Sequence, residues 1–317
     1  MTKVSVCITA FNHERFIKDC LISVISQLID VDLEILVGDD NSIDRTQAIV
    51  EGLVQKFPGV IRYFKHEPNL GPSANYQYLV ARAQGEFIAH LDGDDHWLPG
   101  KLIAQLNFMA AHPDCVACYT NAVAVSDVRR LVGGFTSKAP ETFDRAFLLR
   151  KGNFLNHSSL LYRASAKQEI TQIAGPFIDY RIHLNLGKRG LLGFLDEALV
   201  VYRCGSAHSM VRTAPDNVML LYLEALMEVQ DEHSLASPLR GACLDFWCRI
   251  VTDAITRGRV SWAIKWARLL KQSYWQRPVG LLLVGAGLAT LRLPFLVLRR
   301  AIPKLGLASD LRILHER

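Results

Sequence analysis

The sequence predicts an α/β fold in which helices cover both faces of a mostly parallel sheet. Strand-like and helix-like hydrophobic patterns alternate through the first 125 residues, an order typical of parallel strands joined by helices. Half of the 317 residues are hydrophobic, so the chain can bury a large core. Polar side chains also follow three of the expected strands, which is where sheets of this kind bind ligands.

Nine segments within the first 125 residues carry this prediction. Strands are expected where short apolar runs lie between turn residues, and helices where apolar residues recur every three or four positions. The expected strands cover residues 4–9, 33–37, 60–64, 87–91 and 116–125. The expected helices cover residues 15–26, 46–57, 74–83 and 100–112, with Ser73 as the N-cap of the third.

The pattern is less regular after residue 125. A strand with a polar lead-in is expected at residues 156–162, and helical spacing extends over residues 179–189. Two short strands are expected at residues 191–194 and 198–202, and helices over residues 217–275.

These elements predict one α/β domain followed by a different kind of region. The domain is expected to cover residues 1–212, with a first half at 1–125 and a second half at 126–212. Residues 213–317 are expected to form a helical C-terminal region that ends in a basic, apolar tail.

The positive charge is concentrated at the C-terminus. Residues 257–317 carry 12 Lys/Arg and 2 Asp/Glu, whereas the whole chain has a net charge of +5. The basic residues alternate with long aliphatic side chains and no nucleic-acid-binding motif is present, so nucleic acid is not an expected partner. The first residues do not have the pattern of a signal peptide.

The cysteines do not form a recognisable framework. There are seven of them, scattered along the chain, which argues against a disulfide scaffold and fits a reducing compartment. Cys115 and Cys118 form a single CxxC pair without a second pair or a histidine cluster. We expect them to be small buried residues rather than metal ligands.

An acidic cluster follows the strand expected at residues 87–91. Asp92, Asp94 and Asp95 lie within four positions, around Gly93. Hard oxygen ligands on a short turn suit Mg²⁺ or Mn²⁺, which could bind a diphosphate. The alternative is a solvated acidic turn before a helix.

Other strand ends bring polar groups to the same edge. Thr9 ends the first expected strand, and Asp39 and Asp40 end the second. Because parallel strands end at one edge of a sheet, these residues should meet the acidic cluster.

Five ordered blocks resemble the family 2 glycosyltransferases, which have the GT-A fold and invert the sugar configuration. The blocks are residues 4–12, 34–46, 69–71, 85–95 and 179–203, so the resemblance covers about residues 1–210. It implies that residues 1–125 are the nucleotide-binding half and that residues 126–212 are the acceptor half.

The resemblance assigns the donor site residue by residue. Thr9, Phe11 and Asp39 would form the nucleotide-base pocket, with a turn or cap residue as the alternative for Asp39. Asn69 and Gly71 would form a loop beside the nucleotide, although that loop could also be a plain turn. Asp92-Gly93-Asp94 matches the family's DxD signature. Asp94 would contact Mn²⁺ or Mg²⁺ directly, with Asp92 and Asp95 in support. Phe11 stands where the family usually has Tyr, and Asn41 where it has Gly.

The resemblance also implies a catalytic base. Asp179 would deprotonate the acceptor hydroxyl, although a helix N-cap is the alternative, and the family usually has an acidic pair here. His183, one turn further, could contact a substrate or be a structural histidine. Arg203 and His208 would lie over the diphosphate, and His157 resembles a position near the acceptor.

The C-terminal tail has an apolar run that is too short and too interrupted for a comfortable membrane span. Residues 278–298 are mostly apolar, and Arg277, Arg299, Arg300 and Lys304 flank them. We expect residues 277–304 to dock on a membrane surface. The alternative is a helix packed on the domain.

Together these features predict an inverting, metal-dependent glycosyltransferase on the cytoplasmic face of the plasma membrane. It would move a hexosyl or N-acetylhexosaminyl group from a nucleotide-diphosphate donor, UDP-linked, to a hydroxyl of a lipid-linked or polysaccharide acceptor. One alternative is a non-catalytic scaffold that binds nucleotide sugars. A sugar-nucleotide pyrophosphorylase is less consistent with the sequence, because residues 10–14 lack its Gly-rich basic loop.

Overall fold

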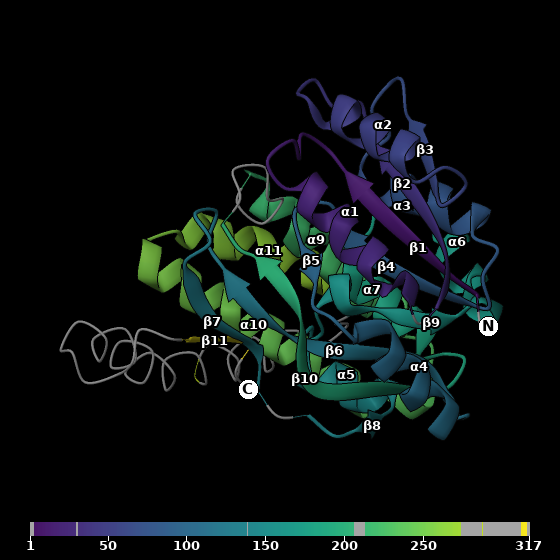
Figure 1. The fold of residues 1–317 in the computed structure, drawn as a ribbon. Helices are drawn as coiled ribbons and strands as arrows, with labels where there is room; N and C mark the ends of the chain where they lie inside the picture. Colours follow the sequence, from purple (N-terminus) through teal and green to yellow (C-terminus); the bar gives the residue numbers. More distant parts are fainter. Residues whose placement is uncertain are drawn as a thin grey trace. The chain divides into compact units, whose positions relative to one another are not determined.

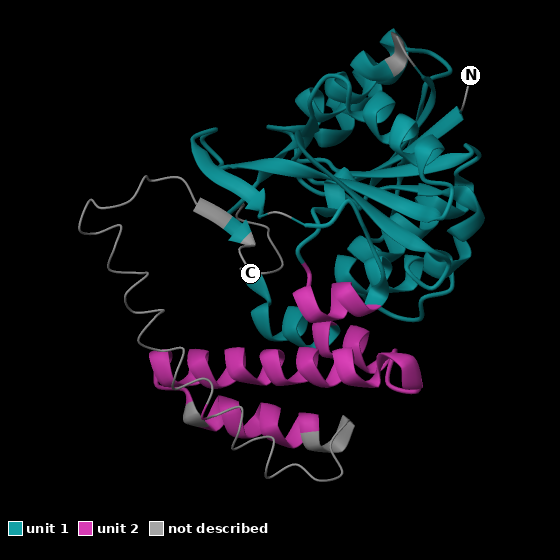
Figure 2. Ribbon diagram, turned by 90° about the horizontal axis from the view of Figure 1, so that it is seen from below, with its two compact units in different colours: residues 1–145, 154–221, 311–317 teal, residues 146–153, 222–310 magenta. Residues whose placement is uncertain are grey.

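The computed structural model describes residues 3–29, 31–137, 139–205, 213–273, 287 and 312–315. The chain forms two compact units, which are coloured separately in Figure 2. Unit 1 contains residues 1–145, 154–221 and 311–317, and unit 2 contains residues 146–153 and 222–310. The chain passes between units after residues 145, 153, 221 and 310, and the domain division at residue 212 stays a prediction.

Unit 1 is built on the predicted parallel strands. β1 (Lys3–Ala10) pairs in parallel with β2 (Asp32–Asp39) and β4 (Phe87–Asp92), and β2 pairs in parallel with β3 (Ile61–Lys65). Figure 1 shows these strands side by side. The register places Ala10 opposite Asp39 and Thr9 opposite Asp92, so the expected meeting of strand ends is confirmed.

Antiparallel strands extend the sheet beyond β4, and the sequence did not predict them as such. β9 (Leu161–Arg163) lies between β4 and β6 (Cys115–Val125) and is antiparallel to both. On the outer side, β7 (Leu131–Thr136) is antiparallel to β6. β11 (Arg312–His315) pairs in parallel with β7. Beyond residue 273 it is the one run of consecutive residues that the structure describes.

One long strand replaces the two short ones expected at residues 191–202. β10 (Leu191–Arg203) runs parallel to β6, with irregular register between Leu195 and Val200. It also pairs with β5 (His96–Trp97) and β8 (Thr142–Phe143). A short polar stretch, Asp196-Glu197, falls within the irregularity, and this interrupts the apolar pattern without ending the strand.

Helices cover both faces of this sheet, as expected. The helices of unit 1 are α1 (Ile17–Ile25), α2 (Thr46–Lys56), α3 (Pro72–Arg82), α4 (Lys101–Ala111), α6 (Gln168–Thr171) and α7 (Asp179–Leu186). Apolar residues of α1, α2 and α4 share one core with alternate residues of β1, β2 and β4. α3 packs on β1 and β2 from the other side, where Asn75 approaches Gly38. Short 3-10 turns η1 (Ser26–Ile29), η2 (His157–Ser159) and η3 (Ala164–Ala166) complete the unit.

The predicted Ser73 cap is wrong. Gly71 occupies the N-cap of α3 with φ +86°, and Ser73 lies inside the first turn. The Ser73 hydroxyl instead donates to the Phe177 carbonyl and accepts from the Phe177 N–H, both at 2.9 Å. Ser73 therefore links α3 to the segment that leads into α7.

Unit 2 is helical, as predicted for residues 217–275. Its main helices are α10 (Ala236–Arg257) and α11 (Val260–Ser273), preceded by η4 (His233–Leu235). Two further helices cross the unit boundary, namely α5 (Arg145–Lys151) and α9 (Pro215–Met227). Leu239, Cys243 and Ile250 of α10 are buried. The ring of Phe246 in α10 packs edge-on against the Trp266 ring of α11, with ring centres 5.7 Å apart.

No helix among the described residues has the length and apolar character needed to cross a membrane. The predicted docking segment 277–304 lies outside the described residues, apart from residue 287.

Candidate active site

The loops after β1 and β2 are joined by backbone-to-side-chain hydrogen bonds. The Asn12 N–H donates to Ser42 Oγ at 2.9 Å, and the Ile43 N–H donates to Asn12 Oδ1 at 3.0 Å. Asn12 and Asn41 have φ of +55° and +67°. Asparagine tolerates this left-handed conformation, so Asn41 can stand where the family usually has Gly.

Asp39 is completely buried at the end of β2. Its Oδ1 accepts the Ser42 N–H at 2.8 Å, and its Oδ2 accepts the Tyr63 hydroxyl at 2.6 Å. Burial, followed by the Asp39 carboxylate, raises the pKa of Tyr63 well above its usual value. The carboxylate is therefore held in one orientation. Phe11 follows the end of β1 and is 39% exposed, and the assignment of both residues to a base pocket stays a prediction.

Asp40 holds the loop at residues 69–71, a role that the sequence analysis missed. Its two carboxylate oxygens accept the N–H groups of Leu70 and Gly71, at 2.6 and 2.9 Å. The Asn69 amide donates to the Asp40 carbonyl at 2.7 Å. A sequence alone does not show which of two adjacent aspartates contacts a distant loop. The structure nevertheless brings this loop to the edge of the sheet that carries Asp39.

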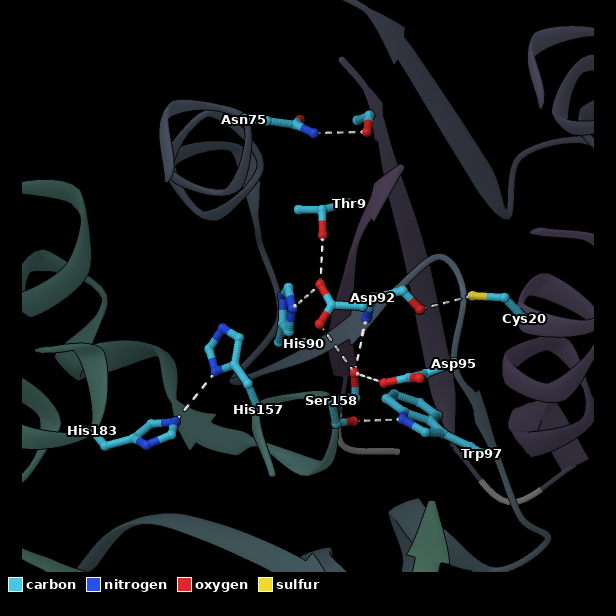
Figure 3. Close-up of polar contacts among 11 residues, drawn as sticks. Thr9, Cys20, Asn75, His90, Asp92, Asp95, Trp97, His157, Ser158 and His183 are labelled. Carbon is cyan, nitrogen blue, oxygen red and sulfur yellow. Dashed lines mark hydrogen bonds and ion pairs between the residues drawn. The ribbon is translucent and has the colours of Figure 1, made fainter. Parts of the chain in front are cut away.

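Asp92 lies at the centre of the polar contacts drawn in Figure 3. Its Oδ1 accepts from the Thr9 hydroxyl at 3.0 Å and lies 3.1 Å from His90 Nε2. Burial alone would raise the pKa of Asp92, but His90, His157 and the Thr9 hydroxyl outweigh it and lower the pKa. Asp92 is therefore ionised and oriented.

Residues 92–95 form a turn that we call the acidic turn, and close packing in it requires Gly93. A Cβ at this position would lie 2.8 Å from His13 Nδ1 and 3.0 Å from the Thr9 carbonyl oxygen. The Gly93 N–H donates to that carbonyl at 2.8 Å. The glycine of the predicted DxD signature thus allows the turn to lie directly against the end of β1.

Asp95 accepts hydrogen bonds at both of its carboxylate oxygens. The Arg203 N–H donates to Oδ1 at 2.7 Å, and the Ser158 hydroxyl donates to Oδ2 at 2.6 Å. Burial, and then the charges of Asp94 and Asp92, raise the pKa of Asp95. These contacts favour a supporting role for Asp95.

The surroundings of Asp94 disfavour the charged form of its carboxyl group. Its pKa is raised by burial and by Asp92, although His13 and Arg203 act in the opposite direction. Within the described residues, no group of three His, Cys, Asp or Glu side chains is placed to hold a metal ion. Mg²⁺ and similar ions in nucleotide sites are commonly held by one or two carboxylates together with substrate phosphates. Asp94 therefore fits a cation that binds together with a diphosphate.

Arg203 braces the acidic turn from the end of β10. Its Nε donates to the Asp94 carbonyl at 3.0 Å, its Nη1 donates to the Ser126 carbonyl at 3.1 Å, and its guanidinium lies 4.0 Å from the centre of the Phe16 ring. The predicted position near the phosphates stays a prediction. His208 lies outside the described residues.

Asp179 is the first residue of α7, and Ile178 is the N-cap. Asp179 was expected as the N-cap if it is not the base, but it lies one residue inside the helix. Its Oδ1 accepts the N–H of the next residue, Tyr180, at 2.8 Å. The assignment as a base stays a prediction. His183, four residues further, is fully buried, and burial lowers its pKa to about 3, with a smaller effect from His90. This burial favours the structural alternative for His183.

The family profile described as glycosyl transferase family 2 matches residues 5–171. The chain belongs to glycosyltransferase family 2. The match includes β1, β2 and the acidic turn, whose residues meet in unit 1.

Relatives of the chain agree with this membership. The chain is 39% identical over 103 residues to a GalNAc(5)-diNAcBac-PP-undecaprenol beta-1,3-glucosyltransferase of Campylobacter jejuni, covering 32% of this chain and 33% of that protein. It is 29% identical over 207 residues to the putative teichuronic acid biosynthesis glycosyltransferase TuaG of Bacillus subtilis, covering 63% and 78%. An uncharacterized protein of Mycobacterium bovis is 26% identical over 205 residues, 63% of this chain, and the match spans 58% of its length.

Solved structures share the GT-A fold. TarS residues 1–349 of S. aureus, in complex with UDP-GlcNAc, has a TM-score of 0.67 at 19% identity and covers 85% of this chain and 80% of its own. The mannosyltransferase PcManGT of Pyrobaculum calidifontis, with GDP-Man and Mn²⁺, has a TM-score of 0.54 at 15% identity, covering 92% and 87%. At these identities the likeness is evidence for the fold alone.

Proposed function

We propose that the protein is an inverting, divalent-metal-dependent glycosyltransferase that uses a UDP-sugar. The convergence of Thr9, Asp39 and the acidic turn at one edge of the sheet carries this proposal. Membership of family 2 and the UDP-GlcNAc bound by the structurally similar TarS support it.

The residues at this edge divide the work of donor binding. Asp39 and Phe11 hold the base, and the loop at residues 69–71, fixed by Asp40, lies beside the nucleotide. Asp94, supported by Asp92, holds Mn²⁺ or Mg²⁺. When bound, the cation neutralises charge on the diphosphate leaving group.

Asp179 removes the proton from the attacking acceptor hydroxyl. Its place in the first turn of α7 puts its carboxyl group at the positive end of the helix dipole. Inversion requires this group to act on the face of the sugar opposite the leaving diphosphate.

The acceptor is a hydroxyl of a cell-envelope glycan, polysaccharide or lipid-linked. The activities named for the relatives from Campylobacter jejuni and Bacillus subtilis support this class. We further propose that the enzyme works in the cytoplasm on the inner face of the plasma membrane, to which residues 277–304 bind.

The test is release of UDP from a panel of UDP-sugars by purified full-length protein, with and without Mn²⁺. Asp94→Ala should lower the Mn²⁺-dependent rate by about 100-fold or more, since charge stabilisation at a leaving group commonly contributes that much. Asp196→Ala is a matched control, because Asp196 lies in the β10 irregularity rather than in the site. Equal UDP release by wild type and Asp94→Ala would favour the scaffold alternative.

A further inference from the structure

Two adjacent residues of the 3-10 turn η2 contact the acidic turn and α7, the helix that begins with Asp179. Ser158 is buried against the acidic turn, and His157 is directed toward α7, as Figure 3 shows. η2 continues directly into β9, which is hydrogen-bonded between β4 and β6. The turn is therefore fixed to the centre of the sheet.

Ser158 holds the acidic turn through several contacts. Its hydroxyl oxygen accepts the backbone N–H of Asp92 at 3.1 Å and donates to Asp95 Oδ2 at 2.6 Å. Its carbonyl accepts the Trp97 indole N–H at 2.8 Å. One residue thus fixes the start of the acidic turn, its end and the strand that follows it.

His157 contacts α7 from the neighbouring position. Its Nδ1 lies 3.3 Å from Nε2 of His183, which is four residues after Asp179 on the same helix. The His157 ring also lies against the His90 ring, with ring centres 4.0 Å apart and planes tilted by 30°. His90 Nε2 in turn contacts Asp92. Imidazole contacts therefore run without a break from Asp92 to α7.

We propose that η2 is a positioning element that sets Asp179 relative to the acidic turn, with Ser158 fixing the turn and His157 fixing α7 through His183. The proposal rests on the proposed function, because it assigns a purpose to the distance between the base and the leaving group.

The physical reason is the steep dependence of group transfer on geometry. The base must act on one face of the sugar while the diphosphate leaves from the other, so both must be held in a single frame. A misplacement of about 1 Å can cost about 100-fold in rate.

The experiment compares His157→Leu, His157→Asn and Ser158→Ala in the full-length protein. The Asn amide reaches the position of His Nδ1, so His157→Asn retains a hydrogen-bonding group toward His183 and His157→Leu does not. His157→Leu should lower kcat for sugar transfer by about 10- to 100-fold with UDP affinity within about 2-fold of wild type. His157→Asn should recover most of that loss. Ser158→Ala should instead weaken Mn²⁺-dependent UDP binding.

His112→Leu is the matched control, since His112 also stacks on an aromatic ring, Phe108, but lies at the end of α4. It should leave transfer unchanged. Equal losses of transfer rate and UDP affinity in His157→Leu, or no recovery in His157→Asn, would overturn the proposal.

Hydrogen exchange separates this proposal from the proposed function. His157→Leu should speed amide exchange in α7, and His112→Leu should not. Unchanged exchange in α7 would refute the positioning role even in an active enzyme. An inactive wild type would refute the proposed function, while the exchange measurement would still test the connection between η2 and α7.

Discussion

At the scale of single residues, the site depends on carboxylate side chains that hydrogen bonds hold in one orientation. Asp39, Asp92 and Asp95 each accept two or more hydrogen bonds from defined donors, so their orientations are set before any substrate arrives. Preorganised charge of this kind is the main way in which proteins stabilise developing charge.

Gly93→Ala should damage the site more than its size suggests. The new methyl group would meet His13 Nδ1 and the Thr9 carbonyl within 3.0 Å, so the acidic turn must move away from β1. We expect a loss of Mn²⁺-dependent UDP affinity of about 10-fold or more, by isothermal titration calorimetry. Gly52→Ala in α2 is the control, because nothing lies within 4 Å of its Cβ and alanine favours a helix. Wild-type affinity in Gly93→Ala would contradict the close packing.

Lys101 should make stability depend on pH. It is completely buried at the start of α4, donates to Gln105 Oε1 at 2.6 Å and lies 4.0 Å from the centre of the Trp97 ring. Burial lowers the pKa of Lys101 to about 7, from 10.5. The unfolded chain therefore binds more protons than the folded one between these values, so this residue's cost is largest below pH 7 and disappears as the pH rises toward 10.5.

Lys101→Met tests this dependence by removing the buried charge. Urea unfolding should show the variant to be more stable than wild type at pH 6.5, by about 1–3 kcal/mol, with the difference shrinking by pH 9.5. A difference that stays constant over this range would show that the ammonium group is not the cause.

At the scale of elements, loops are held by residues from neighbouring elements as well as by their own side chains. Asp40, directly after β2, fixes the loop before α3, and Ser73 in α3 fixes the segment before α7. The sequence predicted the strands and helices because their hydrophobic periods are local. It assigned Ser73 to a cap because only the folded chain brings Phe177 within reach.

Asp40→Ala should release the loop at residues 69–71. The Leu70 N–H would lose its acceptor and the Gly71 N–H would keep only Asn69 Oδ1, at a cost of about 1 kcal/mol in this partly exposed loop. We expect faster hydrogen exchange in this loop and about 10-fold weaker UDP binding. Asp44→Ala, at an exposed contact in the same β2–α2 connection, is the control. Unchanged exchange at residues 70 and 71 would contradict the assigned role.

At the scale of the whole molecule, most of the parallel half of the sheet could be predicted from sequence. The antiparallel strand β7 could not, because its segment has no regular period and its pairing depends on a distant partner. The strand expected at residues 156–162 is present only as β9, after the turn η2, and its antiparallel pairing was not predictable. Of the candidate site, the convergence of Thr9, Asp39 and Asp92 was predictable from parallel topology. The contacts that Ser158 makes with the acidic turn from η2 were not predictable.

Membrane docking belongs to this scale as well. Replacing Arg299, Arg300 and Lys304 by Gln in the full chain should reduce sedimentation with anionic phosphatidylserine vesicles, because each basic residue near such a surface contributes about 1 kcal/mol. Binding to neutral phosphatidylcholine vesicles should change little. Replacing Arg240 and Arg249 of α10 by Gln is the control. Equal sedimentation of wild type and tail variant would refute docking through residues 277–304.

The pairing of β11 with β7 has a consequence for how the chain is handled. β11 covers backbone N–H and C=O groups on the outer side of β7 that would otherwise form an open edge. Removing residues 312–315 would expose that edge, so that a strand of another copy of the protein can pair with it. A truncation of this kind therefore promotes aggregation. An internal deletion that keeps Arg312–His315 is the safer design.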